Sequence, residues 1–91
     1  MKHNRYFDDR VQSLGFSDRE GAATIGVIDP GEYAFGTSER ERMSVVAGNL
    51  WYRVPGSSWR SAGAGEGFTV PAGVTFEVKA EGPVAYLCRY G

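Results

Sequence analysis

Apolar and polar residues alternate in short runs along the chain, and glycine, proline, aspartate or serine separates one run from the next. Alternation with a period of two is typical of half-buried β-strands, and turn residues at roughly 8–12-residue spacing favour a sandwich or barrel. Residues 38–42 are the only stretch that could form a helical turn. We therefore expect an all-β protein with one domain over residues 1–91. The predicted strands span residues 11–16, 23–28, 33–37, 43–47, 49–54, 58–61, 68–70, 75–79 and 84–90.

Two of these runs, residues 43–47 and 84–88, carry apolar residues on both alternating faces. Such strands fit a closed or double-sheet structure in which one face meets the core and the other meets a partner subunit. A chain of 91 residues also has a thin core for its surface, which favours self-association. We expect a homodimer, with the N-terminal strands as its interface.

Charge and composition exclude several classes of protein. The formal net charge is −1 and the arginines are scattered, so no nucleic-acid-binding surface is predicted. No apolar stretch approaches the roughly 20 residues of a membrane helix, and residues 1–10 lack the apolar segment of a signal peptide. The lone cysteine, Cys88, rules out an intrachain disulfide. We expect a soluble cytoplasmic protein without a membrane or nucleic-acid partner.

The stretch Gly-Glu-Gly-Phe-Thr-Val-Pro-Ala-Gly, residues 65–73, predicts a turn, a short strand and a Pro-x-Gly turn. It resembles the second motif of the cupin superfamily, G-x5-P-x-G-x2-H-x3-N, whose glycines and proline match Gly65, Pro71 and Gly73. Phe76 stands where that motif has a metal-binding histidine, and Ala80 stands where it has asparagine. The resemblance implies a cupin fold, the RmlC-like double-stranded β-helix or jelly-roll barrel.

The first cupin motif, G-x5-H-x-H-x3,4-E-x6-G, is matched only in its second half, where Glu41 and Gly48 keep the E-x6-G spacing. Phe35 and Thr37 occupy the two histidine positions. A metal site needs several converging ligands, and the only histidine, His3, lies in an N-terminal segment that we expect to fray. We therefore expect no metal centre and no histidine-based catalysis.

The would-be metal pocket is predicted to be aromatic and polar. Alternation places Tyr33, Phe35 and Thr37 on one strand face, and Glu41 and Met43 on one face of the next strand. Taken one at a time, Phe35, Met43, Val45 and Phe76 are better explained as barrel core than as ligand contacts. Glu41 either points into the barrel or is solvated with Arg40 and Arg42. Arg89, within Tyr-Leu-Cys-Arg-Tyr, is either a surface group or an anion site in the barrel mouth.

Taken whole, the chain resembles the small single-domain, metal-free cupins of the pyrimidine/purine nucleoside phosphorylase family. The matching segments run nearly end to end, from Val-x-Ser-Leu-Gly-Phe through Pro-Gly-Glu-Tyr-x-Phe-x-Thr and Glu-Arg-Met-x-Val-Val to Tyr-Leu-Cys-Arg-Tyr. The resemblance implies broad-specificity phosphorolysis: inorganic phosphate, as co-substrate, cleaves purine and pyrimidine nucleosides to free base and ribose 1-phosphate, without any other cofactor.

The resemblance also implies roles for particular residues. Arg89 would hold phosphate with help from the Thr37 hydroxyl, and Glu41 would bind ribose hydroxyls or stabilise positive charge on the sugar. The leaving base would be assisted by Tyr33, Tyr90 or water. The expected substrate-binding residues are Tyr33, Phe35, Met43, Phe76 and Tyr90.

Two other functions fit the same residues. One is a non-catalytic metal-free cupin that binds a sugar or small anionic ligand in the same pocket. The other is a structural or interaction protein whose aromatic residues are core and whose function lies in the dimer surface. An inward-facing Arg89 near Glu41 and Thr37 would weigh against the structural alternative.

Overall fold

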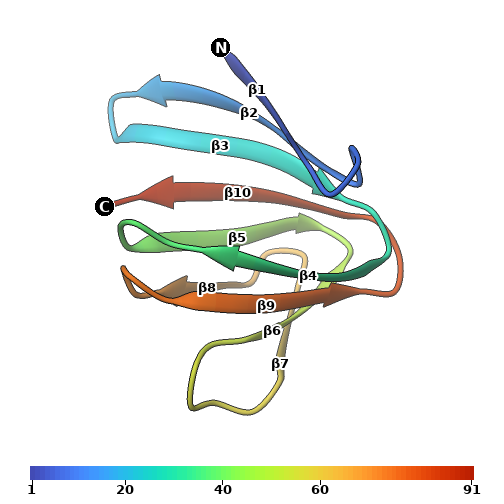
Figure 1. Ribbon diagram of the computed structural model, residues 1–91. Coiled ribbons are helices and arrows are strands. Elements are labelled where there is room, and N and C mark those ends of the chain that lie inside the picture. The colour runs from blue at the N-terminus through green and yellow to red at the C-terminus, as the bar shows by residue number, and fades with distance from the viewer.

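The alternating pattern folds into ten strands and no helix, as the computed structural model of residues 1–91 shows (Figure 1). No helix is present that could cross a membrane. The strands are β1 (Lys2–Tyr6), β2 (Val11–Asp18), β3 (Gly21–Ile28), β4 (Gly31–Gly36), β5 (Glu41–Ala47), β6 (Asn49–Arg53), β7 (Arg60–Gly63), β8 (Gly67–Val70), β9 (Thr75–Ala80) and β10 (Val84–Tyr90).

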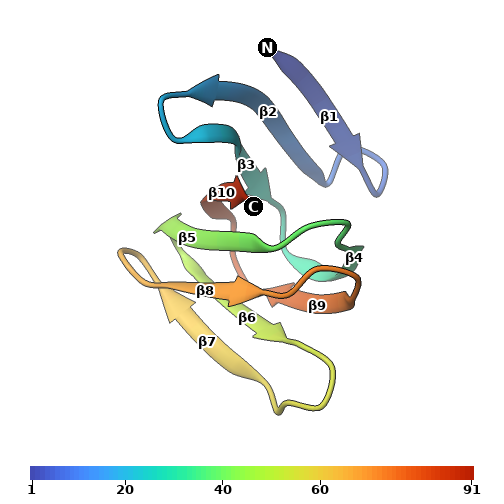
Figure 2. The same cartoon turned by 90° about the vertical axis from the view of Figure 1, so that its left-hand side faces the viewer.

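The strands form two antiparallel sheets that face each other (Figure 2). The larger sheet has the order β1-β2-β3-β10-β5-β8, and the smaller has the order β4-β9-β6-β7. Neighbours in each sheet come from distant parts of the chain, as where β10 lies between β3 and β5. This is the jelly-roll arrangement of a cupin, so the predicted fold class is confirmed.

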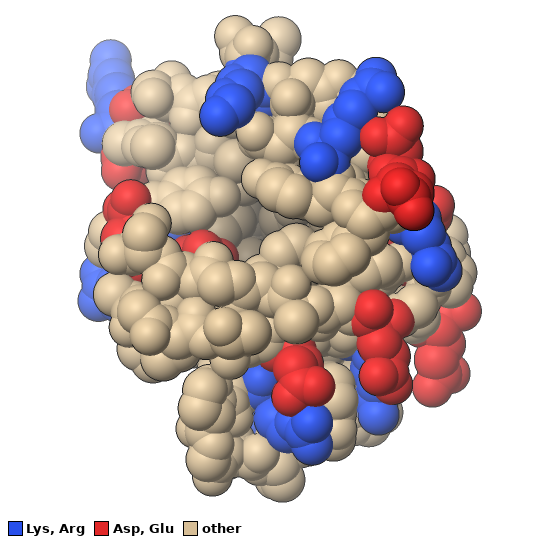
Figure 3. Space-filling view, viewed as in Figure 1, with Lys and Arg blue, Asp and Glu red and all other residues tan.

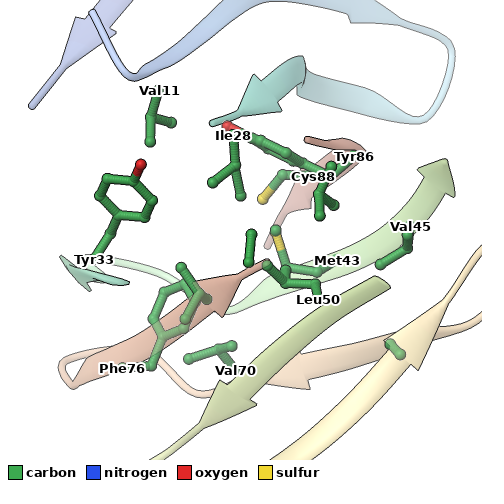
Figure 4. Close-up of a cluster of buried hydrophobic side chains, with 14 residues drawn as sticks. Val11, Ile28, Tyr33, Met43, Val45, Leu50, Val70, Phe76, Tyr86 and Cys88 are labelled. Carbon is green, nitrogen blue, oxygen red and sulfur yellow. The ribbon is translucent and has the colours of Figure 1, made fainter. Parts of the chain in front are cut away.

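The core lies between the sheets and follows the alternation along each strand. In β10, buried Val84, Tyr86 and Cys88 alternate with Ala85 and Leu87, which face outward. Side chains from both sheets converge in the same way on one cluster of 14 buried residues (Figure 4). We call the sheet faces that carry this cluster the inner faces, and the opposite faces the outer faces.

The motif glycines serve the turns around β8. Gly65 and Gly73 have φ angles of 86° and 75°, a left-handed conformation that side chains with a Cβ rarely adopt. Gly67 approaches the backbone of Met43 so closely that a Cβ would collide with it. The motif therefore specifies how β8 meets β5 and how the chain turns into β9.

The observed strands match the predicted ones to within two residues at every end. One expectation was wrong. The N-terminal segment forms β1, paired with β2, rather than fraying. Residues 38–42 form no helical turn, because β5 already begins at Glu41 and pairs there with Tyr90 and Val70.

Candidate functional site

The molecule is hollowed between the β1–β3 layer and the layer of β4 and β9 (Figure 3). An open hollow of about 550 Å³ is lined by residues of β1, β2, β3 and β10, among them Lys2, Asn4, Tyr6, Thr24 and Tyr90. A cavity of about 40 Å³ lies between the sheets. It is lined by Ile28, Phe35, Met43, Phe76, Val78 and Tyr86. We call the hollow and the cavity together the inner cleft.

The strand register explains why polar residues of β1 face this cleft. Lys2, Asn4 and Tyr6 pair directly with Gly15, Ser13 and Val11 of β2, and directly paired residues project to the same side of a sheet. Val11 and Ser13 are buried, so that side is the inner face. The Asn4 amide donates to the Ser13 hydroxyl at 3.2 Å, and the hydroxyls of Thr24 and Tyr90 lie 3.0 Å apart.

Three predicted residues form the apolar wall of the cleft. Phe35 of β4 and Phe76 of β9 are cross-strand partners whose ring centroids lie 5.9 Å apart. Met43 of β5 comes from the facing sheet and lines the same cavity. The structure thus places the two aromatic residues that replace cupin histidines beside each other at the centre of the barrel.

Glu41 is the acidic group next to the cleft, on β5 directly opposite Tyr90, which lines the hollow. It opens β5 on the face of Met43 and Val45, is half-buried, and accepts a hydrogen bond at 3.5 Å from the Cys88 thiol. Burial raises the pKa of the Glu41 carboxyl and the charge of Glu39 adds to the effect, while the hydrogen bond from Cys88 opposes it.

Neither neighbouring arginine neutralises Glu41. The Arg40 guanidinium donates instead to the carbonyl of Gly91, at 2.7 and 3.2 Å, and no ion pair of Arg42 is present. The carboxyl is therefore directed into the barrel, which decides between the two alternatives for this residue.

The other ionisable groups near Glu41 stay protonated at neutral pH. Burial raises the pKa of the Cys88 thiol to about 12, and the Glu41 charge raises it as well. Burial likewise raises the pKa of Tyr86 to about 12 and raises the pKa of Tyr90. The two phenols on β10 are thus neutral hydrogen-bonding groups near the Glu41 carboxyl.

Two predicted residues have hydroxyls that are already engaged in structural hydrogen bonds. Thr37 lies just beyond the end of β4, where its hydroxyl donates to the Pro71 carbonyl at 2.8 Å and accepts from the Val74 amide at 3.1 Å. The Tyr33 hydroxyl donates to the carbonyls of Asp29 and Pro30. The Thr37 hydroxyl therefore holds the Pro71–Val74 turn against the end of β4. Tyr33 is a core residue whose hydroxyl binds the turn between β3 and β4.

Arg89 does not join Glu41 and Thr37 inside the barrel. It lies on the outer face of β10, opposite in direction to Cys88 and Tyr90, and its side chain is 18% exposed. Its guanidinium binds both carboxylate oxygens of Asp18 at 3.0 and 2.8 Å and lies 3.0 Å from Glu20. The bidentate hydrogen bond lowers the pKa of Asp18 and raises that of Arg89. The grouping of Arg89, Thr37 and Glu41 that we expected is therefore not the one observed.

Sequence reasoning missed the residues that β1 contributes to the cleft. Lys2, Asn4 and Tyr6 alternate with outward-facing residues, but they are polar or lie near the chain start and gave no apolar signal. The neighbouring pair Tyr6–Phe7 was the available clue, because two aromatic residues before Asp-Asp are unusual for a solvated terminus. His3 lies on the outer side of β1, 2.9 Å from Gln12, and no cluster of three potential metal ligands is present.

Two facing antiparallel sheets, with Gly65, Pro71 and Gly73 at the motif turns and aromatic side chains at the histidine positions, define a cupin. A family model described as pyrimidine/purine nucleoside phosphorylase matches residues 1–90, and the chain belongs to this family.

Individual relatives agree over the whole length. A pyrimidine/purine nucleoside phosphorylase of Pseudomonas fluorescens is 51% identical, with 99% of this chain and 97% of that protein covered. One of Anaeromyxobacter sp. is 48% identical, with coverages of 99% and 87%. A solved structure of a Vibrio parahaemolyticus protein of unknown function superposes with a TM-score of 0.95 at 42% identity, covering 99% of this chain and 97% of the other.

Proposed function

We propose that the chain cleaves purine and pyrimidine nucleosides with inorganic phosphate in the inner cleft, giving free base and ribose 1-phosphate. The family and the names of its relatives support the reaction. The observation that carries the assignment to this site is Glu41, a half-buried carboxyl without a cation partner among aromatic walls and protonated phenols. Such a carboxyl is costly to keep in a barrel that only needs a core.

Glu41 would stabilise the sugar as the glycosidic bond breaks. A phosphate oxygen attacks C1′, the C1′–N bond breaks, and its electron pair goes to the base nitrogen. Positive charge develops on the ribose ring in between, and a half-buried carboxylate stabilises that charge more strongly than a fully solvated one does. The Tyr90 hydroxyl, opposite Glu41 on the neighbouring strand, would donate a hydrogen bond to the leaving base, which takes its proton from water.

The walls of the cleft fit a base of either class. Phe35 and Phe76 present ring faces and edges but no hydrogen-bonding atoms, and stacking on a ring does not distinguish one base from another. A site that held the base by its edges would select between purines and pyrimidines. The proposed broad specificity follows from that difference.

Phosphate would bind in the hollow. Lys2 has the one cationic side chain among the residues that line it, and the Asn4 amide adds a donor, because its bond to Ser13 uses only one of its two N–H groups. Thr24 would donate to the Tyr90 hydroxyl, which leaves the Tyr90 proton for the base. Arg89 is disfavoured for this role because Asp18 and Glu20 already occupy its guanidinium and would repel phosphate. The reaction needs no further cofactor, because phosphate itself is the nucleophile.

The reaction is tested by incubating purified protein with uridine or adenosine, with and without phosphate, and following base release. Phosphate-dependent release with equimolar ribose 1-phosphate supports the proposal. Release that ignores phosphate would indicate hydrolysis. A protein that binds nucleosides or small anions without releasing base would instead be the non-catalytic cupin.

The phosphate site is tested by comparing Lys2→Ala with Arg89→Ala. We expect Lys2→Ala to raise the KM for phosphate while Arg89→Ala leaves it near the wild-type value. If only Arg89→Ala raises the KM for phosphate, Arg89 binds the phosphate, and the assignment of the phosphate site to Lys2 is refuted.

We further propose that the chain forms a homodimer through the outer face of β2, β3 and β5. Leu14, Ile25, Val27 and Val46 are 40–55% exposed there, and Leu14 pairs directly with Ile25. A groove of about 510 Å³ runs over the same face. Light scattering should give twice the chain mass, and Ile25→Lys should give a monomer because it places a charge in an apolar interface. A wild-type monomer would refute the interface.

We place the protein in the cytoplasm, where the Cys88 thiol stays reduced.

A further inference from the structure

Tyr6 and Phe7 connect two sheet edges that share no strand pairing. Tyr6 ends β1, the edge strand of the larger sheet, and Phe7 follows it in the turn to β2. The Tyr6 ring meets the edge of Phe35 at 6.1 Å between centroids. Phe7 contacts Phe35 at 5.4 Å and Tyr33 at 5.0 Å. Both partners belong to β4, the edge strand of the smaller sheet, so the two rings close one side of the barrel.

The turn that presents these rings is strained. Phe7, Asp8 and Asp9 have φ angles of 53°, 55° and 68°, the only positive values outside glycine in the chain. Left-handed conformations cost about 1–2 kcal/mol per residue for side chains with a Cβ, and non-glycine residues seldom adopt them in succession. Hydrogen bonds on the flank hold the turn, from the Arg10 amide to the Phe7 carbonyl and from the Gln12 amide group to the Asp9 carbonyl.

The size of the inner cavity shows why this closure matters. At about 40 Å³ the cavity between Phe35 and Phe76 has room for a few water molecules, whereas small-molecule sites need roughly 300–1,000 Å³. The hollow outside it is large enough, at about 550 Å³. Tyr6 lines the hollow and touches Phe35, which lines the cavity, so their contact lies where the two spaces meet.

The side that carries Tyr6 is the one that can move. β1 pairs only with β2, and four of its five residues are exposed. The rings themselves are held by few neighbours, since Tyr6 is 45% and Phe7 is 43% exposed. Phe76, in contrast, is buried on β9, which pairs with a strand on either side.

We propose that Tyr6 and Phe7 are an aromatic gate: they move aside to admit a nucleoside and close against its base, stacking it over Phe35. This gate deepens the proposed function and rests on it, because the ligand it would recognise is the nucleobase. The strained turn keeps the gate aromatics at the opening although they remain largely exposed. The competing explanation is that these aromatic contacts only hold β1 against β4 and take no part in binding, which we call a structural staple.

Kinetics in the synthetic direction separate these two explanations. The substrates there are free base and ribose 1-phosphate, and only the base should meet the gate. Loss of one base–aromatic stack costs about 1–3 kcal/mol, so Phe7→Ala and Tyr6→Ala should raise the KM for the base about fivefold or more. The KM for ribose 1-phosphate should stay near wild type in both variants.

Trp51→Ala is the matched control, because it removes an aromatic ring from the outer face of the smaller sheet, where Lys79 covers it. A staple would predict equal loss of affinity for both substrates, or a loss of thermal stability with unchanged KM values. Either result in an enzyme that turns over would overturn the gate.

A binding measurement keeps the gate testable apart from turnover. With fluorinated tyrosine and no phosphate, the Tyr6 ring resonance should shift when adenosine is added and should not shift with ribose. A Tyr6 resonance whose chemical shift is unchanged at saturating adenosine would overturn the gate. A shift in a protein that shows no phosphorolysis would uphold the gate and refute the proposed reaction instead.

Discussion

The ionisation of Cys88 reports directly on the environment of Glu41, because it is the only cysteine and its thiol donates to that carboxyl. Burial and the Glu41 charge raise its pKa from the ordinary 9.0 to about 12. Three pKa units correspond to about 4 kcal/mol of unfavourable ionisation. At pH 9 about one thiol in a thousand would be ionised in the fold, whereas half would be ionised in a free cysteine.

The perturbation is Glu41→Gln, which keeps an oxygen to accept the thiol hydrogen bond and removes the charge. We expect the pKa of Cys88 to fall in this variant and to stay above 9.0, since burial is the larger cause. The assay is the ¹³Cβ chemical shift of Cys88 followed by NMR up to about pH 10.5, with the amide spectrum confirming that the protein stays folded. A wild-type midpoint near pH 9, or an identical titration in Glu41→Gln, would refute the placement of the carboxylate.

The same variant has a second, independent signature in stability. The pKa of Glu41 is raised in the fold above its ordinary 4.5, so the protonated form is favoured there. The stability linked to this group is present below pH 4.5 and is lost as pH rises through the raised pKa. Glu41→Gln should therefore gain stability over wild type on going from acid to neutral pH. A constant difference across that window would contradict the raised pKa.

Three further predictions concern the scaffold. Asp8→Gly should raise the free energy of unfolding by about 0.5–1 kcal/mol and Asp8→Val should lower it, because φ is 55° at this residue. Denaturant titration measures both changes, and a change of the same sign in the two variants would contradict the strain. Gly26→Ala should lower the free energy of unfolding by about 1–3 kcal/mol, since the added Cβ would lie 2.6 Å from the Tyr86 hydroxyl. Gly82→Ala places its Cβ in open space and should lower it by less than about 0.5 kcal/mol. The Arg89 hydrogen bond lowers the pKa of Asp18, so the stability that the Asp18 carboxylate adds to the fold is lost as pH falls below 3.8. The melting temperature of Asp18→Asn should therefore fall less between neutral and acid pH than that of wild type, and an equal fall in both would contradict the lowered pKa.

The sequence predicted the strands wherever one face is apolar, and failed at β1 for a physical reason. The inner face of β1 carries Lys2, Asn4 and Tyr6 because it faces an open hollow rather than the core. A strand whose inner face meets water has no apolar period to detect. The residues that extend the candidate site were therefore the ones that pattern analysis could not find.

The inward placement of Phe35, Phe76 and Glu41 was predictable, because motif and alternation agree at these positions. Arg89 was not, because both faces of β10 are largely apolar and alternation alone does not say which one is inner. Thr37 is buried as alternation predicts, but the bonds that engage its hydroxyl, to Pro71 and Val74, come from the motif turn and are not visible in the strand period. Pairing partners such as Asp18, 71 residues away from Arg89, come only from the fold.

We propose that Glu41, next to the inner cleft, stabilises the sugar during phosphorolysis. The most direct test compares ribose 1-phosphate formation from uridine and phosphate by wild type, Glu41→Gln and Glu39→Gln, the last removing a neighbouring exposed carboxylate. We predict that Glu41→Gln lowers kcat/KM by about 100-fold or more, as loss of one transition-state contact does, and that Glu39→Gln stays within about twofold of wild type. A folded Glu41→Gln variant with wild-type turnover would contradict the account.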